Sequence, residues 1–162
     1  MRFLIHAVII GAGATAVMDI WGLVQKRMLG VRGLDYAMVG RWIGHLVRGR
    51  FRHDSIAATS PVAGERVIGW TAHYAIGVAF AALLLGIWGL DWASNPSLAP
   101  ALIVALATTV APFLVLQPAL GLGIAASRTP RPSIARFRTV VTHLSFGLGL
   151  YLTAQLRFLF PL

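Results

Sequence analysis

The chain has 162 residues, of which 57% are hydrophobic and 12% charged, and it contains no cysteine. A soluble domain averages about 45–50% apolar and about 25% charged residues, so this composition indicates an integral membrane protein. The absence of cysteine excludes disulfides and thiolate metal sites. The net charge of +9 lies in segments that flank the apolar runs, where basic residues orient spans and bind anionic lipid headgroups. We therefore expect membrane lipids and not nucleic acid as partners.

Four apolar runs are long enough to cross a bilayer, which takes about 20 helical residues. They cover about residues 3–24, 67–90, 98–126 and 139–160. The first run imitates a secretory signal, but its basic cluster follows the segment instead of preceding it, which favours a retained span. The fold class we predict is all-α, a four-helix transmembrane bundle that forms a single domain over residues 1–162.

The connections between these runs differ in charge. The first and third are rich in basic residues, namely Lys26, Arg27, Arg32, Arg41, Arg48, Arg50, Arg52 and Arg66, and then Arg128, Arg131, Arg136 and Arg138. The second connection, "DWASNPS", has neither lysine nor arginine. By the positive-inside rule, the first and third connections are cytoplasmic and both termini lie outside. Arg2 and Arg157 oppose this orientation, although Arg157 can reach the outer interface along its flexible stem.

Helical spacing of apolar residues predicts a further helix over about residues 35–49, with Asp35 as its N-cap. Basic residues and His45 occupy another face, which is typical of an amphipathic helix that lies on the cytoplasmic leaflet. Two roles are open for this helix: anchoring to anionic lipid, or lining the mouth of a site. The residues at that mouth would be Arg41, His45, His53, Glu65 and Arg66.

Each predicted span carries one strongly polar side chain in its cytoplasmic half, and these are Asp19, His73, Gln117 and His143. At 1.5 Å per residue, Asp19 and His73 each lie about 10 Å from the nearest basic boundary residue. Small residues share a helical stripe with each of the four, and they let helices approach closely in lipid. These residues are Gly11, Thr15, Gly69, Gly77, Gly121, Thr139 and Gly147. We therefore expect the four polar groups, with Thr15 and Thr139, to line a pocket open to the cytoplasm.

Three functions fit such a pocket. The first is binding or transport of a small molecule, proton or ion, with Asp19 as acceptor and His73 as its proton-sharing partner. The second is ligation of haem b or a metal by His73 and His143. The third is an enzyme acting on a lipid-linked substrate, with Glu65 and Arg66 near its phosphate. Against all three stands simple packing, with a neutral Asp19 hydrogen-bonded to a histidine.

The catalytic and metal-binding motifs that the sequence lacks help to decide among these functions. The sequence has no HxxxH or ExxH pattern, nucleophile elbow, P-loop or dinucleotide fingerprint, which argues against a hydrolytic metal site and against an enzyme. Binding or transport without a cofactor is therefore the preferred interpretation. Four helices are few for a complete alternating-access transporter, which favours a homodimer.

Five stretches of the chain carry a family resemblance. They are "MDIWG" (18–22), "VGRWIGH" (39–45), "SPVAGERVIGWTAHYAIG" (60–77), "PFLVLQPALGLGIAAS" (112–127) and "HLSFGLGLYL" (143–152). With these stretches the chain resembles the small bacterial membrane proteins of the Domain of Unknown Function 2938 family. The resemblance implies a four-span protein of the bacterial inner membrane, and it supplies no activity.

Overall fold

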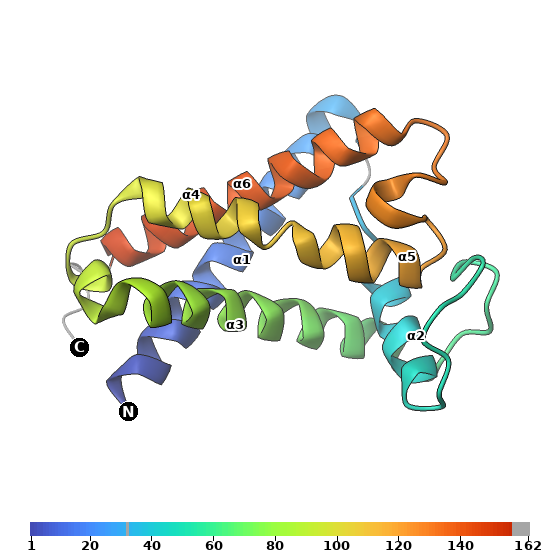
Figure 1. The fold of residues 1–162 in the computed structure, drawn as a ribbon, viewed down its shortest axis with the longest axis horizontal. Coiled ribbons are helices and arrows are strands. Elements are labelled where there is room, and N and C mark those ends of the chain that lie inside the picture. Colours follow the sequence, from blue (N-terminus) through green and yellow to red (C-terminus); the bar gives the residue numbers. More distant parts are fainter. Residues whose placement is uncertain (32, 157–162) are drawn as a thin grey trace. The chain divides into compact units, whose positions relative to one another are not determined.

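The computed structural model describes residues 1–31 and 33–156, and the regular structure in these ranges is helical (Figure 1). The elements in chain order are α1 (Arg2–Leu29), α2 (Tyr36–Leu46), α3 (Glu65–Ser94), α4 (Leu98–Ala107), the π-helix η1 (Pro112–Leu116), α5 (Gln117–Ala119), the 3-10 helix η2 (Ile124–Ala126) and α6 (Pro132–Leu156). Within the described residues, three helices are long and apolar enough to cross a membrane: α1, α3 and the run Leu98–Ala119. The all-α class is thus confirmed, together with the potential of three predicted segments to span a membrane.

The fourth predicted span corresponds to α6, which is helical but is not among those three helices. Its first turns are polar, because they contain Arg136 and Arg138. The end of the predicted span, residues 157–160 with Arg157, lies outside the described residues. A fourth membrane crossing therefore stays a prediction.

The predicted third span was too long at its C-terminal end. It was expected to reach residue 126, but the helix ends at Ala119. Gly121 and Gly123 follow with φ of 92° and 76°, values in the left-handed region that glycine adopts without a Cβ clash. Inside the run, Pro112 lacks an N–H group, and the backbone widens there into the π-helix η1, a usual response to a disturbed helical ladder.

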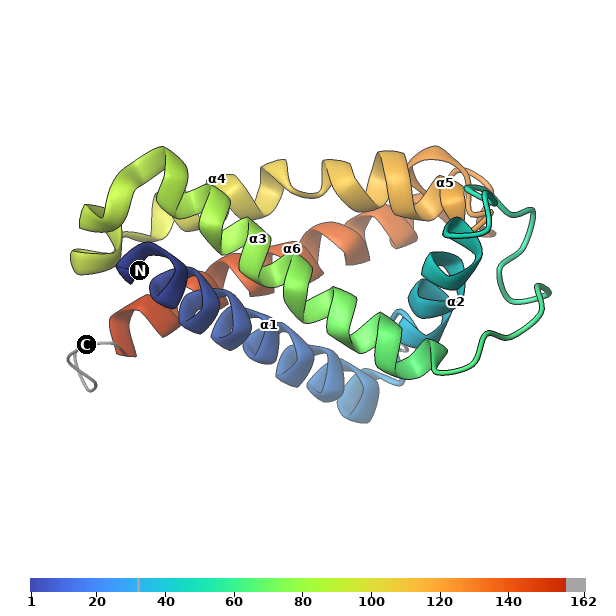
Figure 2. The same cartoon turned by 90° about the horizontal axis from the view of Figure 1, so that it is seen from below.

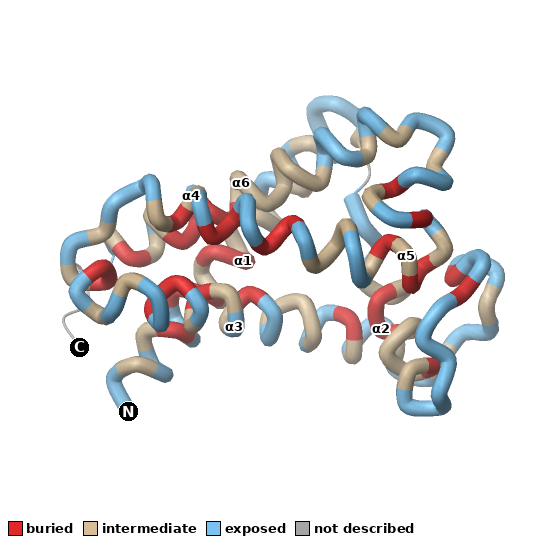
Figure 3. The backbone as a smooth tube through the Cα atoms, viewed as in Figure 1, coloured by how far each residue is buried: buried red, intermediate tan, exposed pale blue. Residues whose placement is uncertain are grey.

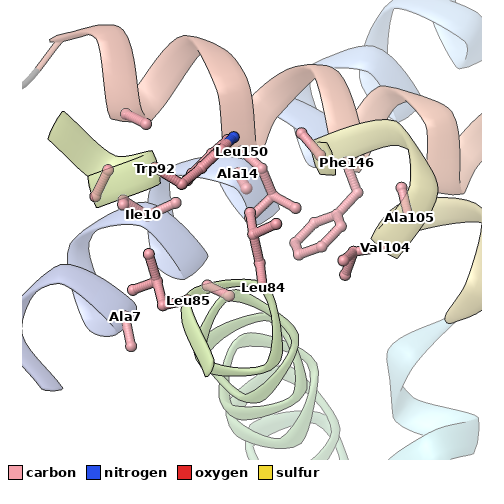
Figure 4. Close-up of a cluster of buried hydrophobic side chains, with 14 residues drawn as sticks. Ala7, Ile10, Ala14, Leu84, Leu85, Trp92, Val104, Ala105, Phe146 and Leu150 are labelled. Atoms are coloured by element: carbon pink, nitrogen blue, oxygen red, sulfur yellow. The ribbon is translucent and has the colours of Figure 1, made fainter. Parts of the chain in front are cut away.

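The chain divides into two compact units, each assembled from separate segments. The first unit comprises residues 1–33, 74–108 and 141–162, and the second comprises residues 34–73 and 109–140. Parts of α1, α3, α4 and α6 build the core of the first unit, and Figure 4 shows their side chains converging. Leu84, Leu85 and Leu150 are fully buried there, beside Phe146. Such a cluster requires every one of these helices to turn an apolar face inward.

The outer faces of the first unit are apolar as well. Figure 3 shows exposed positions recurring along α1, α3 and α4, and many of these positions carry large hydrophobic side chains. Examples are Leu4, Val8, Ile20, Ile76, Ile87, Ile103 and Leu106. Soluble monomers rarely expose apolar patches this extensive. Together with the three long apolar helices, these exposed apolar faces indicate a membrane protein.

Small residues set the closest helix contacts in the first unit. A Cβ added at Gly11 would lie 2.5 Å from the Cα of Val78, and one at Gly149 would lie 2.8 Å from the Cα of Ala14. Gly147 would similarly meet Ala105 of α4. The expectation that small-residue stripes mark close packing is confirmed at these positions. Gly147 and Gly149 thus pack against α4 and α1 within the first unit.

The second unit contains α2 and the first turns of α3, which lie beside each other in both Figure 1 and Figure 2. Asp35 caps α2 as predicted, because its carboxylate accepts a hydrogen bond of 3.0 Å from the backbone N–H of Ala37. The helix ends at Leu46, three residues earlier than expected, since residues 47–49 form a turn closed by Gly49 with φ of 81°. Whether α2 lies on a membrane surface stays a prediction.

Candidate functional site

In the first unit, Asp19 of α1 is joined to α3 by a hydrogen bond. The phenol of Tyr74 donates to its Oδ2 across 3.1 Å, and both residues are half-buried. Asp19 lies seven residues before Lys26, a distance of about 10 Å along the helix. A carboxylate at that depth in a membrane-spanning helix is expensive and marks a functional candidate.

The contact between Asp19 and Tyr74 is the last step of a regular crossing between α1 and α3. A Cβ at Gly11 would meet Val78, and a Cβ at Gly77 would meet the Oγ1 of Thr15. Successive contacts move forward along α1 and backward along α3, so the next one falls one turn further, at Asp19 and Tyr74. Thr15 donates its hydroxyl to the Gly11 carbonyl at 2.8 Å, which keeps the crossing free of an unpaired hydroxyl.

Sequence reasoning missed Tyr74 and named its neighbour, His73, as the partner of Asp19. The spacing contains a signal for Tyr74, which lies three residues before Gly77 and four before Val78, the residues that face α1. His73 lies in the second unit, where its ring stacks on Tyr36 of α2 with centroids 4.0 Å apart and planes inclined by 24°. A hydrogen bond between Asp19 and His73 stays a prediction.

Two of the predicted pocket residues, Gln117 and Thr139, are brought together in the second unit. The side-chain amide of Gln117 donates to the Thr139 Oγ1 at 3.2 Å, and that hydroxyl donates to the Ala135 carbonyl at 3.0 Å. Gln117 is 9% exposed, and its Oε1 is buried without a hydrogen-bond partner in the part of the chain that the structure describes. His143, the remaining member of the predicted layer, lies half-buried on α6 in the first unit.

Arg41, expected at the mouth of the pocket, joins several segments of the second unit. Its Nε and Nη2 donate to the two carboxylate oxygens of Glu65 at 2.9 and 2.8 Å, a bidentate ion pair. Its Nη1 donates to the carbonyls of Ile56 and Thr59 at 3.2 and 3.0 Å. The hydrogen bond to Glu65 raises the pKa of the Arg41 guanidinium, so this side chain stays charged. Arg41 thus fixes the connection after α2 to the start of α3.

Two other predicted mouth residues, His45 and His53, form a buried pair in the second unit. Their ring centroids are 5.3 Å apart, with planes inclined by 67°, and the residues are 7% and 4% exposed. The Nε2 of His45 lies 3.0 Å from the carbonyl oxygen of Ser60. Neither ring nitrogen of His53 has a hydrogen-bond partner among residues 1–31 and 33–156. Arg66, the last predicted mouth residue, is exposed.

The predicted residues therefore form several small groups rather than one pocket within either unit. The second unit has a hollow of about 280 Å³, which none of the predicted residues lines. Its lining is Thr129, Pro130, Arg131, Ile134, Ala135 and Arg138. In residues 1–31 and 33–156, no group of three or more histidine, aspartate or glutamate side chains is placed to hold a metal ion.

One family model, described as "Protein of unknown function (DUF2938)", matches residues 8–157. The chain therefore belongs to this family, as its five motif stretches indicated. No curated protein and no solved structure matches it. Membership assigns no activity, so any function has to be argued from the residues themselves.

Proposed function

We propose that this family member binds a proton or a small cation inside the bacterial inner membrane, with the Asp19 carboxylate as the binding group. The observation that carries the proposal is the hydrogen bond of 3.1 Å from Tyr74 to Asp19 between α1 and α3, two helices able to cross a membrane. Ionisable groups at membrane depth commonly mark ion pathways and proton relays. Binding or transport through this carboxylate is the activity that the chemistry favours.

The hydrogen bond suits a group that changes its protonation state. An ionised carboxylate accepts through either oxygen, and a protonated carboxyl still accepts through its carbonyl oxygen. Tyr74 can therefore keep its hydrogen bond while Asp19 gains or loses a proton. A phenol in this role holds the carboxyl in place without adding a charge that would fix one state.

The polar residues of the predicted layer fit the same proposal. The predicted spans contain three histidines: His6 near the N-terminus, His73 and His143. Imidazole exchanges protons near neutral pH. His143 belongs to the same unit as Asp19, and we assign it the transfer of protons between Asp19 and the cytoplasm. The direction of this path follows from the basic first and third connections, which the positive-inside rule places in the cytoplasm.

Infrared difference spectroscopy of the protein in lipid nanodiscs tests the proposal. Between acidic and alkaline buffer, the wild type should show the C=O band of a protonated carboxyl. The other carboxyl groups of the chain contribute to the same region, so the Asp19 band is the component that Asp19→Asn removes and that Tyr74→Phe shifts, because its frequency depends on the hydrogen bond. The matched control is Asp91→Asn, which changes an exposed aspartate on the same pair of helices and should leave the Asp19 band intact. A spectrum that Asp19→Asn leaves unchanged refutes the proposal.

A double-mutant cycle measures the contact itself. Asp19→Ala combined with Tyr74→Phe should show a coupling of about 0.6 kcal/mol, the average for hydrogen bonds between membrane helices, with about 1.7 kcal/mol as the upper end. Unfolding in mixed micelles gives the four free energies. Effects that add without coupling would mean that Tyr74 does not stabilise Asp19.

A further inference from the structure

A second polar site, independent of Asp19, is formed by His45 and His53 in the second unit. The backbone on both sides of this pair is held firmly. Arg41 binds the carbonyls of Ile56 and Thr59, and the N–H of His53 donates to the Ala119 carbonyl at 3.0 Å. A Cβ at Gly121 would overlap the Asp54 carbonyl, so the segment 53–56 lies directly against the turn that follows α5. The backbone that carries the two imidazoles is therefore held in place by hydrogen bonds and close packing.

The hydrogen bond of His45 defines which of its nitrogens is free to bind. A carbonyl oxygen only accepts, so the contact of 3.0 Å to Ser60 requires a proton on Nε2. The neutral ring then has its lone pair on Nδ1. A histidine that donates one ring N–H to a backbone carbonyl and presents the other nitrogen is the usual arrangement of a metal ligand.

His53 supplies the second nitrogen. Its ring is buried, and both Nδ1 and Nε2 are without a hydrogen-bond partner among the described residues. Packing alone gives no reason to bury an imidazole with an unused donor and an unused acceptor, and each such group calls for an explanation by a water, an ion or a functional role. A metal ion that binds one nitrogen removes the unused acceptor.

The separation of the rings distinguishes between possible metal geometries. With metal–nitrogen bonds of about 2.05 Å and about 1.15 Å from nitrogen to ring centre, each centroid lies about 3.2 Å from the metal. Two such rings are about 5.2 Å apart at a tetrahedral angle and about 6.4 Å apart in a linear complex. The observed separation of the centroids is 5.3 Å. This separation is compatible with a tetrahedral arrangement and too short for the linear one that two-coordinate copper(I) would need. It also lies in the range of an ordinary edge-on ring contact, and the metal titration below distinguishes the two.

We propose that His45 and His53 together bind a divalent transition-metal ion of the zinc class in a tetrahedral site. Imidazole nitrogens suit such ions, and the absence of cysteine from the chain makes histidine the main borderline ligand available. Two protein ligands leave two positions for water or for an external oxygen or nitrogen ligand.

Zinc titration of the purified full-length protein tests this proposal, with a purification tag that contains no histidine and a prior chelator wash. Calorimetry should show one zinc ion per chain, and zinc should raise the unfolding temperature. His45→Phe and His53→Phe each keep a buried ring and remove the ligand atom, and each should weaken binding by more than about tenfold. The matched control is His6→Phe, which removes a histidine of α1 whose Nδ1 lies 2.8 Å from the Arg2 carbonyl and should leave zinc binding unchanged.

Cobalt(II) gives a measurement that does not depend on the folding of any variant. Bound to the wild type in the same site, it should show the intense visible bands of a tetrahedral complex, and zinc should displace it. Absence of zinc binding, zinc binding unaffected by both phenylalanine variants, or a weak octahedral cobalt spectrum would each overturn the proposal. In those cases His45 and His53 would be packing residues. None of these outcomes bears on Asp19, because the two sites share no residue.

Discussion

The crossing of α2 and α3 in the second unit depends on two glycines, and this dependence can be measured. A Cβ added at Gly69 would overlap the carbonyl oxygen of Tyr36 and lie 3.0 Å from the N of Gly40. A Cβ added at Gly40 would overlap the carbonyl oxygen of Glu65. Because the obstructing atoms belong to the backbone, no side-chain rotation relieves the overlap. Gly69→Ala must therefore separate the two helices.

Two terms set the size of the effect. Overpacking of this kind costs about 1–3 kcal/mol, while replacement of glycine by alanine inside a helix gains about 0.8–1.0 kcal/mol in propensity. Gly86 of the same helix has nothing within 4 Å of an added Cβ, so Gly86→Ala contributes the propensity gain alone. The difference between the free energies of unfolding of the two variants cancels the propensity gain and leaves the cost of the overlap. We expect Gly69→Ala to be less stable than Gly86→Ala by about 1–3 kcal/mol.

Equilibrium unfolding in mixed detergent micelles gives these free energies, and hydrogen exchange shows where the loss occurs. In Gly69→Ala, faster exchange should appear in α2 and in the connection that Arg41 fixes, since both move with the crossing. Equal stability of the two alanine variants, or a loss spread evenly over the chain, would show that α2 and α3 are not in backbone contact at these glycines.

Three further predictions concern the second unit and the orientation of the chain. Arg41→Lys loses the planar fork that binds a carboxylate and two carbonyls at once, so amide exchange over residues 53–60 should accelerate, whereas Arg66→Lys at an exposed position should not change it. Gly121→Ala introduces a side chain at φ of 92° and should destabilise the protein by about 1–3 kcal/mol in the same unfolding assay; an unchanged stability would contradict the described turn. Reporter fusions should give a cytoplasmic signal after Arg50 and an external one after Asn95, and a reversed pattern would invert the proposed orientation.

The helices were predictable because their determinants are local. Apolar runs of membrane length located α1, α3 and the run that contains α4, and the cap at Asp35 located the start of α2. Their ends were harder to predict, since they depend on single glycines whose backbone conformation is set by neighbours. Gly121 illustrates this: it turns the chain where the segment 53–56 leaves no space for a Cβ.

The partners of the site residues were less predictable, because they depend on which helix each face meets. The stripe of small residues correctly marked the side of α3 near residue 77 as a contact surface. It did not show that Gly77 meets α1 while Gly69 meets α2, so it did not identify Tyr74 as a partner of Asp19 or Tyr36 as a partner of His73. The pairing of His45 with His53 also lay beyond local patterns, since the connection between them is positioned by Arg41 and by backbone hydrogen bonds to residues 119 and 120.

The arginines of the first connection show why one pattern in a sequence can hide two roles. In the sequence, all of these arginines belong to the basic segment that orients a membrane protein. Arg41 nevertheless forms a bidentate ion pair with Glu65 and binds backbone carbonyls, so its charge is neutralised within the second unit. The exposed basic residues of the same connection, such as Lys26, Arg27 and Arg66, supply orienting charge without it. The predicted orientation therefore does not require Arg41, and the conformation of the connection does.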